Sequence, residues 1–329
     1  MKPKIFLTRE LPPKAMERLR QHTDLEMNTE DRVLTKEEII KGVKGKDALL
    51  CLLTDAIDGD IMDANPGLKI IANYAVGYNN IDIEAATKRH IPVSNTPGVL
   101  TETSADLAFS LMMALARRLP EADSFVRTGE WKGWGPLQYL GADIYGATLG
   151  IIGLGRIGKA VARRARGFDM NLIYWNRTRL EESEEKALGL QYCPFDQVLA
   201  QADFVSLNVA YNESTHHLIG ERQLALMKNE AYLINTARGP VVDEDALVDA
   251  LKKGEIKGAG LDVYEHEPAV HPELLKMKNT VLLPHIASAS IATRTKMGMI
   301  AIDNLLAACN GEKIPNLVNK ELVYDGHAD

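Results

Sequence analysis

The sequence has little cysteine and no long apolar run. Its three cysteines lie far apart in 329 residues and form no C-x-x-C pair, which argues against a disulfide framework and against a zinc knuckle. No apolar run approaches the length of a membrane span, and the run at residues 5–7 is too short for the core of a signal peptide. We therefore expect a cytoplasmic protein with reduced thiols, no metal site and no membrane partner.

An excess of basic residues is also missing. Lysine and arginine number 38 against 45 aspartates and glutamates, and the net charge is -7. Binding to a phosphate backbone needs the opposite balance, so no nucleic-acid partner is expected. With 46% hydrophobic and 25% charged residues, the chain has the composition of a folded protein, and its length suits two domains.

Short β-rich runs alternate with helix-like segments along the chain, which is typical of parallel α/β architecture. A first series of expected strands comprises residues 4–8, 48–53, 68–74 and 91–94, and a second series comprises residues 147–152, 172–175, 204–209, 231–235, 258–263 and 280–283. A long helix is expected from residue 101 to about residue 118, and a final one over residues 291–309. Apolar residues nearly encircle the helix from residue 101, so we expect it to be buried between units or subunits.

The most specific motif is the glycine loop at residues 153–158, a G-x-G-x-x-G between an expected strand and an expected helix. Gly153 allows a tight turn, Gly155 lets the backbone approach a pyrophosphate, and Gly158 lets the helix pack on the strand. The helix N-terminus then offers N–H groups and a positive dipole to the phosphates. The loop predicts a dinucleotide site that includes Leu154, Arg156 and Ile157.

The turn after the next expected strand bears on the choice of cofactor. An NAD-selective enzyme usually places Asp or Glu about 20 residues past the glycines, to bind the ribose 2′-hydroxyl. Here the turn carries Asn176, Arg177, Thr178 and Arg179, and no carboxylate comes before Glu181. Guanidinium groups match phosphate oxygens, so NADP(H) is the preferred cofactor and NAD(H) a possible one. The alternative is a pair of solvated arginines that stack on the adenine.

Three motifs follow expected strands in the second half of the chain: N-T-A-R-G at residues 235–239, D-V-Y-E-H-E-P at residues 262–268 and P-H-I-A-S-A at residues 284–289. Ligands of open α/β sheets gather at the carboxyl ends of strands. We therefore expect Arg238, Glu267 and His285 to converge on one crevice.

The glycine loop and these motifs resemble, in order and spacing, the D-isomer-specific 2-hydroxyacid dehydrogenase family, over almost the whole chain. Residues 73–82 and the arginine turn look most like the glyoxylate/hydroxypyruvate reductases of that family. The resemblance implies an α/β fold with a Rossmann-type, doubly wound dinucleotide-binding domain at residues 101–287. It also implies a discontinuous, flavodoxin-like substrate-binding domain formed by residues 1–100 and 288–329.

Reduction of a 2-keto acid needs a proton donor and a cation at the carbonyl oxygen. His285 is the expected donor because histidine, with an unperturbed pKa of about 6.5, can give and take a proton near neutral pH. Glu267 would orient the imidazole, and Arg238 would bind the substrate carboxylate. The family resemblance implies further substrate contacts at Leu53, Val76, Gly77 and Ser288. It also implies cofactor contacts at Val209, Thr215, Thr236, Ala237, Asp262 and Ala287, together with Arg238 and His285 themselves.

The sequence thus predicts an NADPH-preferring reductase of glyoxylate and hydroxypyruvate that works as a homodimer on a small 2-keto or 2-hydroxy acid. The first alternative is another D-2-hydroxyacid dehydrogenase, acting on phosphoglycerate, 2-ketogluconate or a bulkier keto acid. A dinucleotide-sensing corepressor is the alternative from a different functional class. Trp134 is either a residue that enters the partner subunit's active site or a buried dimer contact.

Overall fold

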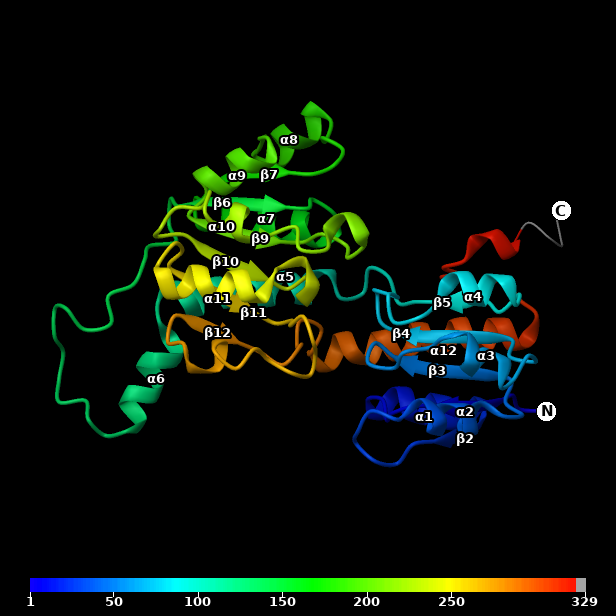
Figure 1. Ribbon diagram of the computed structural model, residues 1–329. Coiled ribbons are helices and arrows are strands. Elements are labelled where there is room, and N and C mark those ends of the chain that lie inside the picture. The colour runs from blue at the N-terminus through cyan, green and yellow to red at the C-terminus, as the bar shows by residue number, and fades with distance from the viewer. Residues whose placement is uncertain (324–329) are drawn as a thin grey trace. The chain divides into compact units, whose positions relative to one another are not determined.

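The computed structural model describes residues 1–323 and contains two sheets in which all strand pairs are parallel. The chain divides into two compact units: unit 1 is Met1–Leu100 with the chain from Ser288 on, and unit 2 is Thr101–Ala287. Each unit has helices on both faces of its sheet (Figure 1). The predicted fold class, a Rossmann-type domain and a second parallel α/β domain, is confirmed.

Unit 1 is built on a five-stranded sheet in the order β2-β1-β3-β4-β5. This is the order of flavodoxin-like doubly wound sheets. The strands are β1 (Lys4–Leu7), β2 (Asp24–Met27), β3 (Ala48–Leu52), β4 (Ile70–Tyr74) and β5 (Val93–Ser94), and the helices are α1 (Pro13–His22), α2 (Lys36–Val43), α3 (Gly59–Asp63), α4 (Ile83–Lys88), α12 (Ile291–Asn310) and the short η4 (Lys320–Val323).

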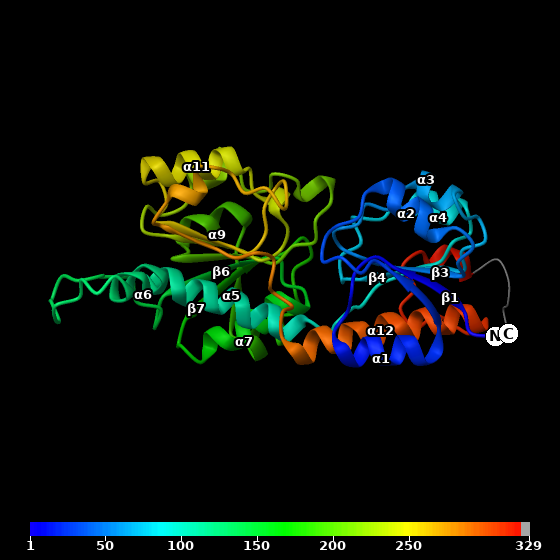
Figure 2. The ribbon, with the colours of Figure 1, turned by 90° about the horizontal axis from the view of Figure 1, so that it is seen from below.

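The two faces of the unit 1 sheet carry separate cores. On one face Ile5, Leu50 and Ala72 pack with apolar residues of α1 and α12, and on the other face Leu49 and Ile71 pack with α2, α3 and α4. Figure 2 shows the two helix layers on opposite sides of this sheet. Successive strand residues alternate between the two cores because side chains of a strand point to opposite faces. Helix α12 therefore completes a core that the first hundred residues begin.

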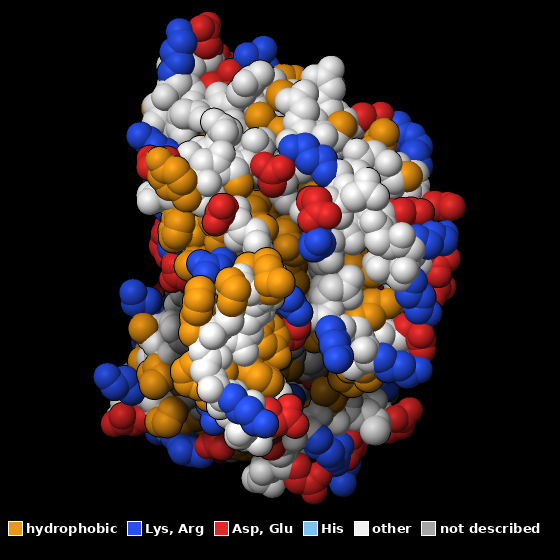
Figure 3. All heavy atoms as spheres, turned by 90° about the vertical axis from the view of Figure 1, so that its left-hand side faces the viewer, with side chains coloured by type: hydrophobic (Ala, Val, Ile, Leu, Met, Phe, Trp, Pro, Cys, Tyr) orange, Lys and Arg blue, Asp and Glu red, His pale blue; other side chains and the backbone are white. Residues whose placement is uncertain are grey.

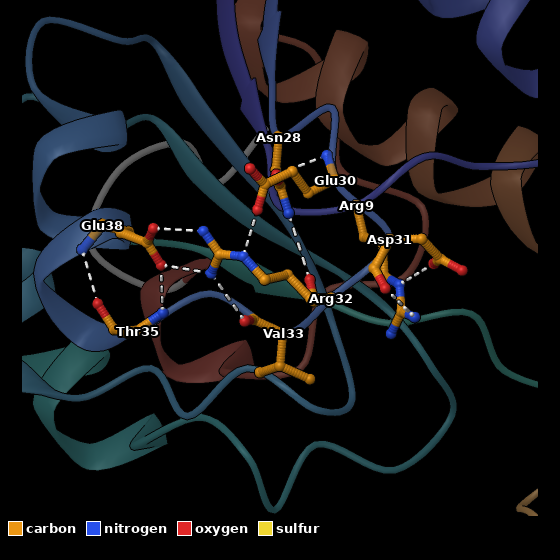
Figure 4. A network of polar contacts seen from close by, with 8 residues as sticks. All are labelled: Arg9, Asn28, Glu30, Asp31, Arg32, Val33, Thr35 and Glu38. Carbon is orange, nitrogen blue, oxygen red and sulfur yellow. Dashed lines mark hydrogen bonds and ion pairs between the residues drawn. The ribbon is translucent and has the colours of Figure 1, made fainter.

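A polar network orders the loop between β2 and α2 (Figure 4). Arg32 donates to both carboxylate oxygens of Glu38, at 2.8 and 2.6 Å, and Thr35 and Glu38 form a capping box at the start of α2. Arg9, just beyond β1, donates to Asp31 at 2.6 Å. Exposed ion pairs of this kind contribute little stability one by one. Together they fix the path of the chain at the carboxyl ends of β1 and β2.

Unit 2 is built on a seven-stranded sheet in the order β12-β11-β10-β9-β6-β7-β8. The order reverses between β6 and β9, as in dinucleotide-binding sheets, whose ligands lie at that reversal. The strands are β6 (Thr148–Ile152), β7 (Asn171–Trp175), β8 (Leu190–Tyr192), β9 (Phe204–Leu207), β10 (Tyr232–Asn235), β11 (Gly258–Leu261) and β12 (Thr280–Leu282), and the helices are α5 (Thr101–Ala116), α6 (Leu119–Arg127), α7 (Arg156–Arg166), α8 (Glu182–Leu188), α9 (Phe195–Gln201), α10 (Glu221–Leu224) and α11 (Glu244–Lys253), with short turns η1 (Glu213–Thr215), η2 (Gly239–Val241) and η3 (Leu274–Lys276).

Helix α5 corrects one expectation from the sequence. Its apolar residues are buried inside unit 2, in the core shared with α7 and the sheet, rather than between units or subunits. Two strand glycines make this possible. A Cβ at Gly258 would lie 3.3 Å from Leu115, and one at Gly260 would lie 3.3 Å from Leu111, so β11 presents a flat surface to the helix.

Unlike α5, the segment that comes next in the sequence exposes many apolar side chains. Helix α6 buries none of its residues, and the chain after it runs out from the sheet (Figure 1). We call residues 119–145 the arm. Its exposed apolar side chains are Leu119, Val126, Trp131, Trp134, Leu137, Leu140 and Tyr145.

The arm is anchored at both ends even though its surface is uncovered. Ala142 N–H donates to the carbonyl of Ala116 at 2.9 Å, and the guanidinium of Arg118 lies over the Tyr139 ring at 5.1 Å. The ring of Phe125 lies 5.4 Å from that of Tyr139. Among residues 1–323 as a whole, no helix is long and apolar enough to span a membrane.

Candidate active site

Three neighbouring strands of unit 2 end side by side and carry the expected catalytic residues. Asn235 at the end of β10 pairs with Leu261 of β11, and Leu261 pairs with Leu282 of β12. Arg238 follows the first of these strand ends and His285 the last, while Glu267 lies in the loop after β11. The parallel register thus brings the three loops to one edge of the sheet.

His285 and Glu267 are in direct contact. The Nδ1 atom of His285 lies 2.8 Å from Oε2 of Glu267, and the side chains are 23% and 29% exposed. The other carboxylate oxygen of Glu267 accepts the Tyr264 N–H at 3.0 Å. Burial alone raises the pKa of Glu267, but the hydrogen bond and charge of His285, the Tyr264 N–H and the charge of Arg238 bring it below its ordinary value. Glu267 is therefore an ionised partner for the imidazole.

The loop that carries His285 is held by Asp262. Both of its carboxylate oxygens accept backbone N–H groups, one from Ile286 at 2.7 Å and one from Ala287 at 2.8 Å. His285 has a φ of 54°, a left-handed conformation that is uncommon outside glycine and needs support from its surroundings. Asp262 provides that support.

Asp262 itself is fully buried. Burial raises its pKa above the ordinary value, and the two N–H bonds and the charge of His285 act in the opposite direction. The Asp262 carboxylate binds the backbone of the His285 loop. Its expected contact with a cofactor stays a prediction.

Arg238 lies in a tight turn that Asn235 builds. The side-chain oxygen of Asn235 accepts Ala237 N–H, and its amide donates to the Arg238 carbonyl, both at 3.0 Å. Nη1 of Arg238 donates to the Ala237 carbonyl at 2.7 Å. Burial lowers the pKa of Arg238 and the charge of Glu267 opposes the change, yet a guanidinium stays protonated in proteins. The site thus holds a partly buried, oriented cation beside the Glu267–His285 pair.

Gly239 sets the distance between the Arg238 turn and the Glu267 loop. A Cβ on this residue would lie 1.8 Å from the Tyr264 carbonyl oxygen and 2.4 Å from the Glu265 nitrogen. No side chain can be accommodated at such distances. The two loops therefore touch through their backbones.

The glycine loop between β6 and α7 has the geometry expected of a pyrophosphate site. Gly153 has a φ of 89°, and a Cβ on Gly158 would lie 2.3 Å from the Gly153 carbonyl oxygen. At Gly155, by contrast, a Cβ would meet nothing within 4 Å, and no side chain caps the N-terminus of α7 there. Open space at the positive end of a helix fits a dinucleotide phosphate. Leu154, Arg156 and Ile157 surround this point in the chain.

The arginine turn after β7 gives its two arginines different surroundings. Arg179 donates through Nε and Nη2 to the buried carboxylate of Glu185, both at 2.8 Å, and Tyr174 donates to the same carboxylate at 2.6 Å. Arg177 is exposed, and Asn176 accepts the Leu154 N–H at 3.1 Å, which joins the turn to the glycine loop. Arg179 therefore neutralises a buried carboxylate, and its expected contact with a cofactor stays a prediction.

The remaining expected cofactor residues lie in loops at the carboxyl ends of strands. Thr215 closes a turn by donating to the Ala210 carbonyl at 2.9 Å. Thr178, Val209, Thr236 and Ala237 are in the loops after β7, β9 and β10, and Ala287 is buried beside Asp262.

The expected substrate loops of unit 1 are also at strand ends. Leu53 follows β3, and Val76 and Gly77 follow β4; Ser288 begins the segment that leads to α12. Amide side chains bind the carbonyl groups of the second loop: Asn95 donates to Val76 at 2.7 Å, and Asn73 donates to Gly77 at 3.0 Å.

The N–H groups of Val76 and Gly77 remain available for a ligand, whereas their carbonyl groups are bound by Asn95 and Asn73. Within residues 1–323, neither residue donates its N–H in a hydrogen bond. The Asn80 amide joins the two substrate loops of unit 1, since it donates to the Leu52 and Asp55 carbonyls at 3.1 and 3.0 Å. Adjacent N–H groups that make no hydrogen bond within the protein are suited to an anion.

Comparison with known proteins identifies the family. The sequence model described as "D-isomer specific 2-hydroxyacid dehydrogenase, NAD binding domain" matches residues 109–287. A glyoxylate reductase of Korarchaeum cryptofilum (strain OPF8) is 53% identical over 326 residues, 98% of each chain. The chain belongs to the D-isomer-specific 2-hydroxyacid dehydrogenase family. The predicted family is thereby confirmed, and unit 2 is its dinucleotide-binding domain.

Solved structures of this dehydrogenase family resemble the whole chain. The crystal structure of a glyoxylate reductase from Paecilomyes thermophila has a TM-score of 0.85 at 37% identity and covers 97% of this chain and 99% of its own. An NADPH-dependent glyoxylate/hydroxypyruvate reductase from Sinorhizobium meliloti, solved with NADP and malonate, has a TM-score of 0.85 at 35% identity and covers 100% of both chains. As a member of the family, the chain is an oxidoreductase that binds a nicotinamide dinucleotide.

Several positioning residues in this family member were not predicted from the sequence. Asn235 and Gly239 flank Arg238 in the motif that singled it out, and an Asn directly after a strand is a known turn-forming signal. Asn95 gave no comparable signal, because its partner is a backbone carbonyl 19 positions away, and Asn73 lies within its strand rather than in the loop that it supports.

Proposed function

We propose that this chain reduces glyoxylate and hydroxypyruvate to glycolate and D-glycerate, with NADPH preferred over NADH. The observation that carries the proposal is the 2.8 Å contact between His285 and the ionised Glu267, beside the partly buried cation Arg238 at three adjacent strand ends. The relatives named glyoxylate reductase support the choice of substrate. When bound, the dinucleotide supplies the hydride, and the protein supplies the proton and the charges that orient the substrate.

His285 is the proposed proton donor. Glu267 occupies its Nδ1 atom, which leaves Nε2 to face the carbonyl oxygen of the substrate. In reduction the proton moves from Nε2 to that oxygen while hydride adds to the carbonyl carbon, and solvent then reprotonates the imidazole. Glu267 keeps the ring in one orientation.

Arg238 is proposed to bind the carboxylate and carbonyl oxygens of the 2-keto acid. Its fork of donors matches a carboxylate, and its burial strengthens the interaction. Within unit 1, the proposed contacts of a substrate carboxylate are the N–H groups of Val76 and Gly77, with Leu53 and Ser288 as further substrate contacts. The amides of Asn73 and Asn95 support this assignment because they keep the carbonyl groups away from an anion.

The proposed preference for NADPH depends on Arg177. It is exposed in the turn after β7, where a 2′-phosphate would bind. No carboxylate that could bind a free ribose comes in this turn before Glu181. Asn176 and Thr178 would add hydrogen bonds. The ion pair of Arg179 with Glu185 makes Arg179 a support of the turn.

Initial rates with NADPH and NADH across glyoxylate, hydroxypyruvate and pyruvate test the proposed function. We expect NADPH to give the higher kcat/KM with glyoxylate and hydroxypyruvate. In the same assay, Arg177→Ala should lower kcat/KM for NADPH about tenfold and leave NADH nearly unchanged, because one charge-assisted contact to phosphate is lost. Lys186→Ala, on the exposed face of α8, is the matched control. Inactivity with every keto acid would reject the function, and equal losses with both cofactors would reject the role of Arg177.

We also propose that the protein is a homodimer through its arm. The arm exposes Trp134 to 84% and Leu137 to 82%, and Figure 3 shows hydrophobic side chains gathered on this face. An apolar surface of this extent is rarely left uncovered in a monomer. Trp134 is then either a dimer contact or a residue that reaches the partner subunit's active site.

Sedimentation of the full chain tests the dimer. We expect a dimer at micromolar concentration, and monomers for the double variant Trp134→Asp and Leu137→Asp, because two charges would be buried in the interface. Leu275→Asp, at an exposed apolar residue outside the arm, should leave the dimer intact. A monomeric wild-type protein would contradict the proposal.

A further inference from the structure

His217 contacts both loops that carry the ionisable groups of the candidate site. Its Nε2 donates to Oε1 of Glu265 at 2.7 Å, and its backbone N–H donates to the Pro240 carbonyl at 2.8 Å. Glu265 comes two residues before Glu267, and Pro240 comes two residues after Arg238. One residue thus links the Glu267 loop to the Arg238 turn.

Glu244 strengthens this link. The N–H of Glu265 donates to Oε1 of Glu244 at 2.7 Å, and the N–H of Glu244 donates to Oε2 of Glu265 at 3.4 Å. Glu244 opens α11, the helix that follows the Arg238 turn. Each oxygen of the Glu265 carboxylate therefore has its own donor, and the donor at Oε1 is His217.

The His217 ring is held in place from two sides. The ring of His216 stacks on it at 4.0 Å, and Oδ2 of Asp243 lies 3.8 Å from its Nδ1. His217 also has a φ of 48°, a left-handed conformation that persists in non-glycine residues only where the surroundings impose it. The backbone turn directs the imidazole towards Glu265.

We propose that His217 is a positioning residue that holds the Glu267 loop against the Arg238 turn, a role that rests on the proposed function. The backbone of Glu265 touches Gly239 directly, so any shift of this loop moves Glu267 relative to Arg238. Glu267 in turn orients the His285 imidazole. Misplacement of reacting groups by about 1 Å can cost about a hundredfold in rate, so a small movement of this loop is enough to matter.

If His217 had only a structural role, its removal would mainly lower the thermal midpoint of unfolding. The positioning role predicts otherwise. The His217 side chain is 35% exposed, and its contacts are polar. Removing it creates no apolar cavity and should change the thermal midpoint little. Its loss should instead appear in kcat.

The test compares His217→Ala and His217→Gln in the full chain. We expect His217→Ala to lower kcat at least about tenfold, with the Kd of NADPH, measured by fluorescence titration, unchanged. His217→Gln keeps an N–H donor for Glu265 and should recover most of the loss. His22→Ala, at an exposed histidine of unit 1, is the control. Full activity of His217→Ala, or an equal loss in His217→Gln, would overturn the proposal.

Two further measurements separate this proposal from the proposed function. In a Glu267→Gln background, His217→Ala should lower kcat less than about twofold, because its effect passes through Glu267; the same loss in both backgrounds would overturn it. Hydrogen exchange of residues 262–268 reads the loop without turnover, and it should accelerate in His217→Ala. Unchanged exchange counts against His217. Unchanged turnover in Glu267→Gln alone counts against the proposed function.

Discussion

His285→Ala is expected to lower kcat for keto-acid reduction by about 10³- to 10⁴-fold and to leave the Kd of NADPH unchanged. The size follows from the loss of general acid catalysis, which contributes up to about 10⁴-fold. The cofactor should still bind because the glycine loop lies at a different strand end from His285. Stopped-flow or steady-state rates with glyoxylate, together with fluorescence titration of NADPH, measure the two quantities.

His271→Ala is the matched control for that variant. His271 is a histidine of the same unit whose Nε2 lies 3.1 Å from the exposed carboxylate of Asp245, and it offers no proton to the candidate site. It should retain wild-type turnover. If His285→Ala kept more than about a tenth of the wild-type kcat, another group would have to be the proton donor.

Arg238→Ala is expected to lower kcat/KM for glyoxylate by about 10²- to 10³-fold. The guanidinium both binds the carboxylate and faces the charge that develops on the carbonyl oxygen, and losing one such donor costs about this much. Arg238→Lys should recover little, because an ammonium cannot reproduce the bidentate geometry. Steady-state kinetics over a wide range of keto-acid concentrations separates the change in KM from the change in kcat.

The Arg238→Ala result needs a control variant and a test of folding. Arg222→Ala removes an exposed arginine paired with Asp196 and should leave the kinetics unchanged. Thermal unfolding of Arg238→Ala should show a folded protein, since the side chain of Asn235 holds the turn by the backbone groups of Ala237 and Arg238 and not by the guanidinium. A folded Arg238→Ala variant with near-normal kcat/KM would remove Arg238 from the substrate site.

The fold class followed from the sequence where strands are buried on both faces. Runs such as residues 48–52 and 148–152 are continuous and apolar because helices cover both sides of the sheet. Strands β2 and β8 were not predicted. Both are short, lie at sheet edges and expose part of their residues, so they lack the apolar run that identified the others.

The candidate site was predictable as far as local signals reach. Arg238, Glu267 and His285 each follow an apolar strand, and parallel strands end at one edge. The residues that hold them were not predictable, because their contacts span long stretches of sequence: His217 and Glu265 are 48 positions apart. The ion pair of Arg179 with Glu185 was not predicted for a related reason, since Glu185 is buried by tertiary packing and no charge pattern reveals this.

The composition of unit 1 has a consequence for synthesis on the ribosome. One face of its sheet is covered by α12, whose Met297, Ala301 and Leu305 pack with Ile5 and Ile70. The first hundred residues therefore emerge with an apolar face that stays open until all of unit 2 and then α12 have been translated. Unit 2, which is continuous, can complete its own core earlier. We expect the nascent chain to depend on chaperones during that interval, and the last helix to be the step that ends the dependence.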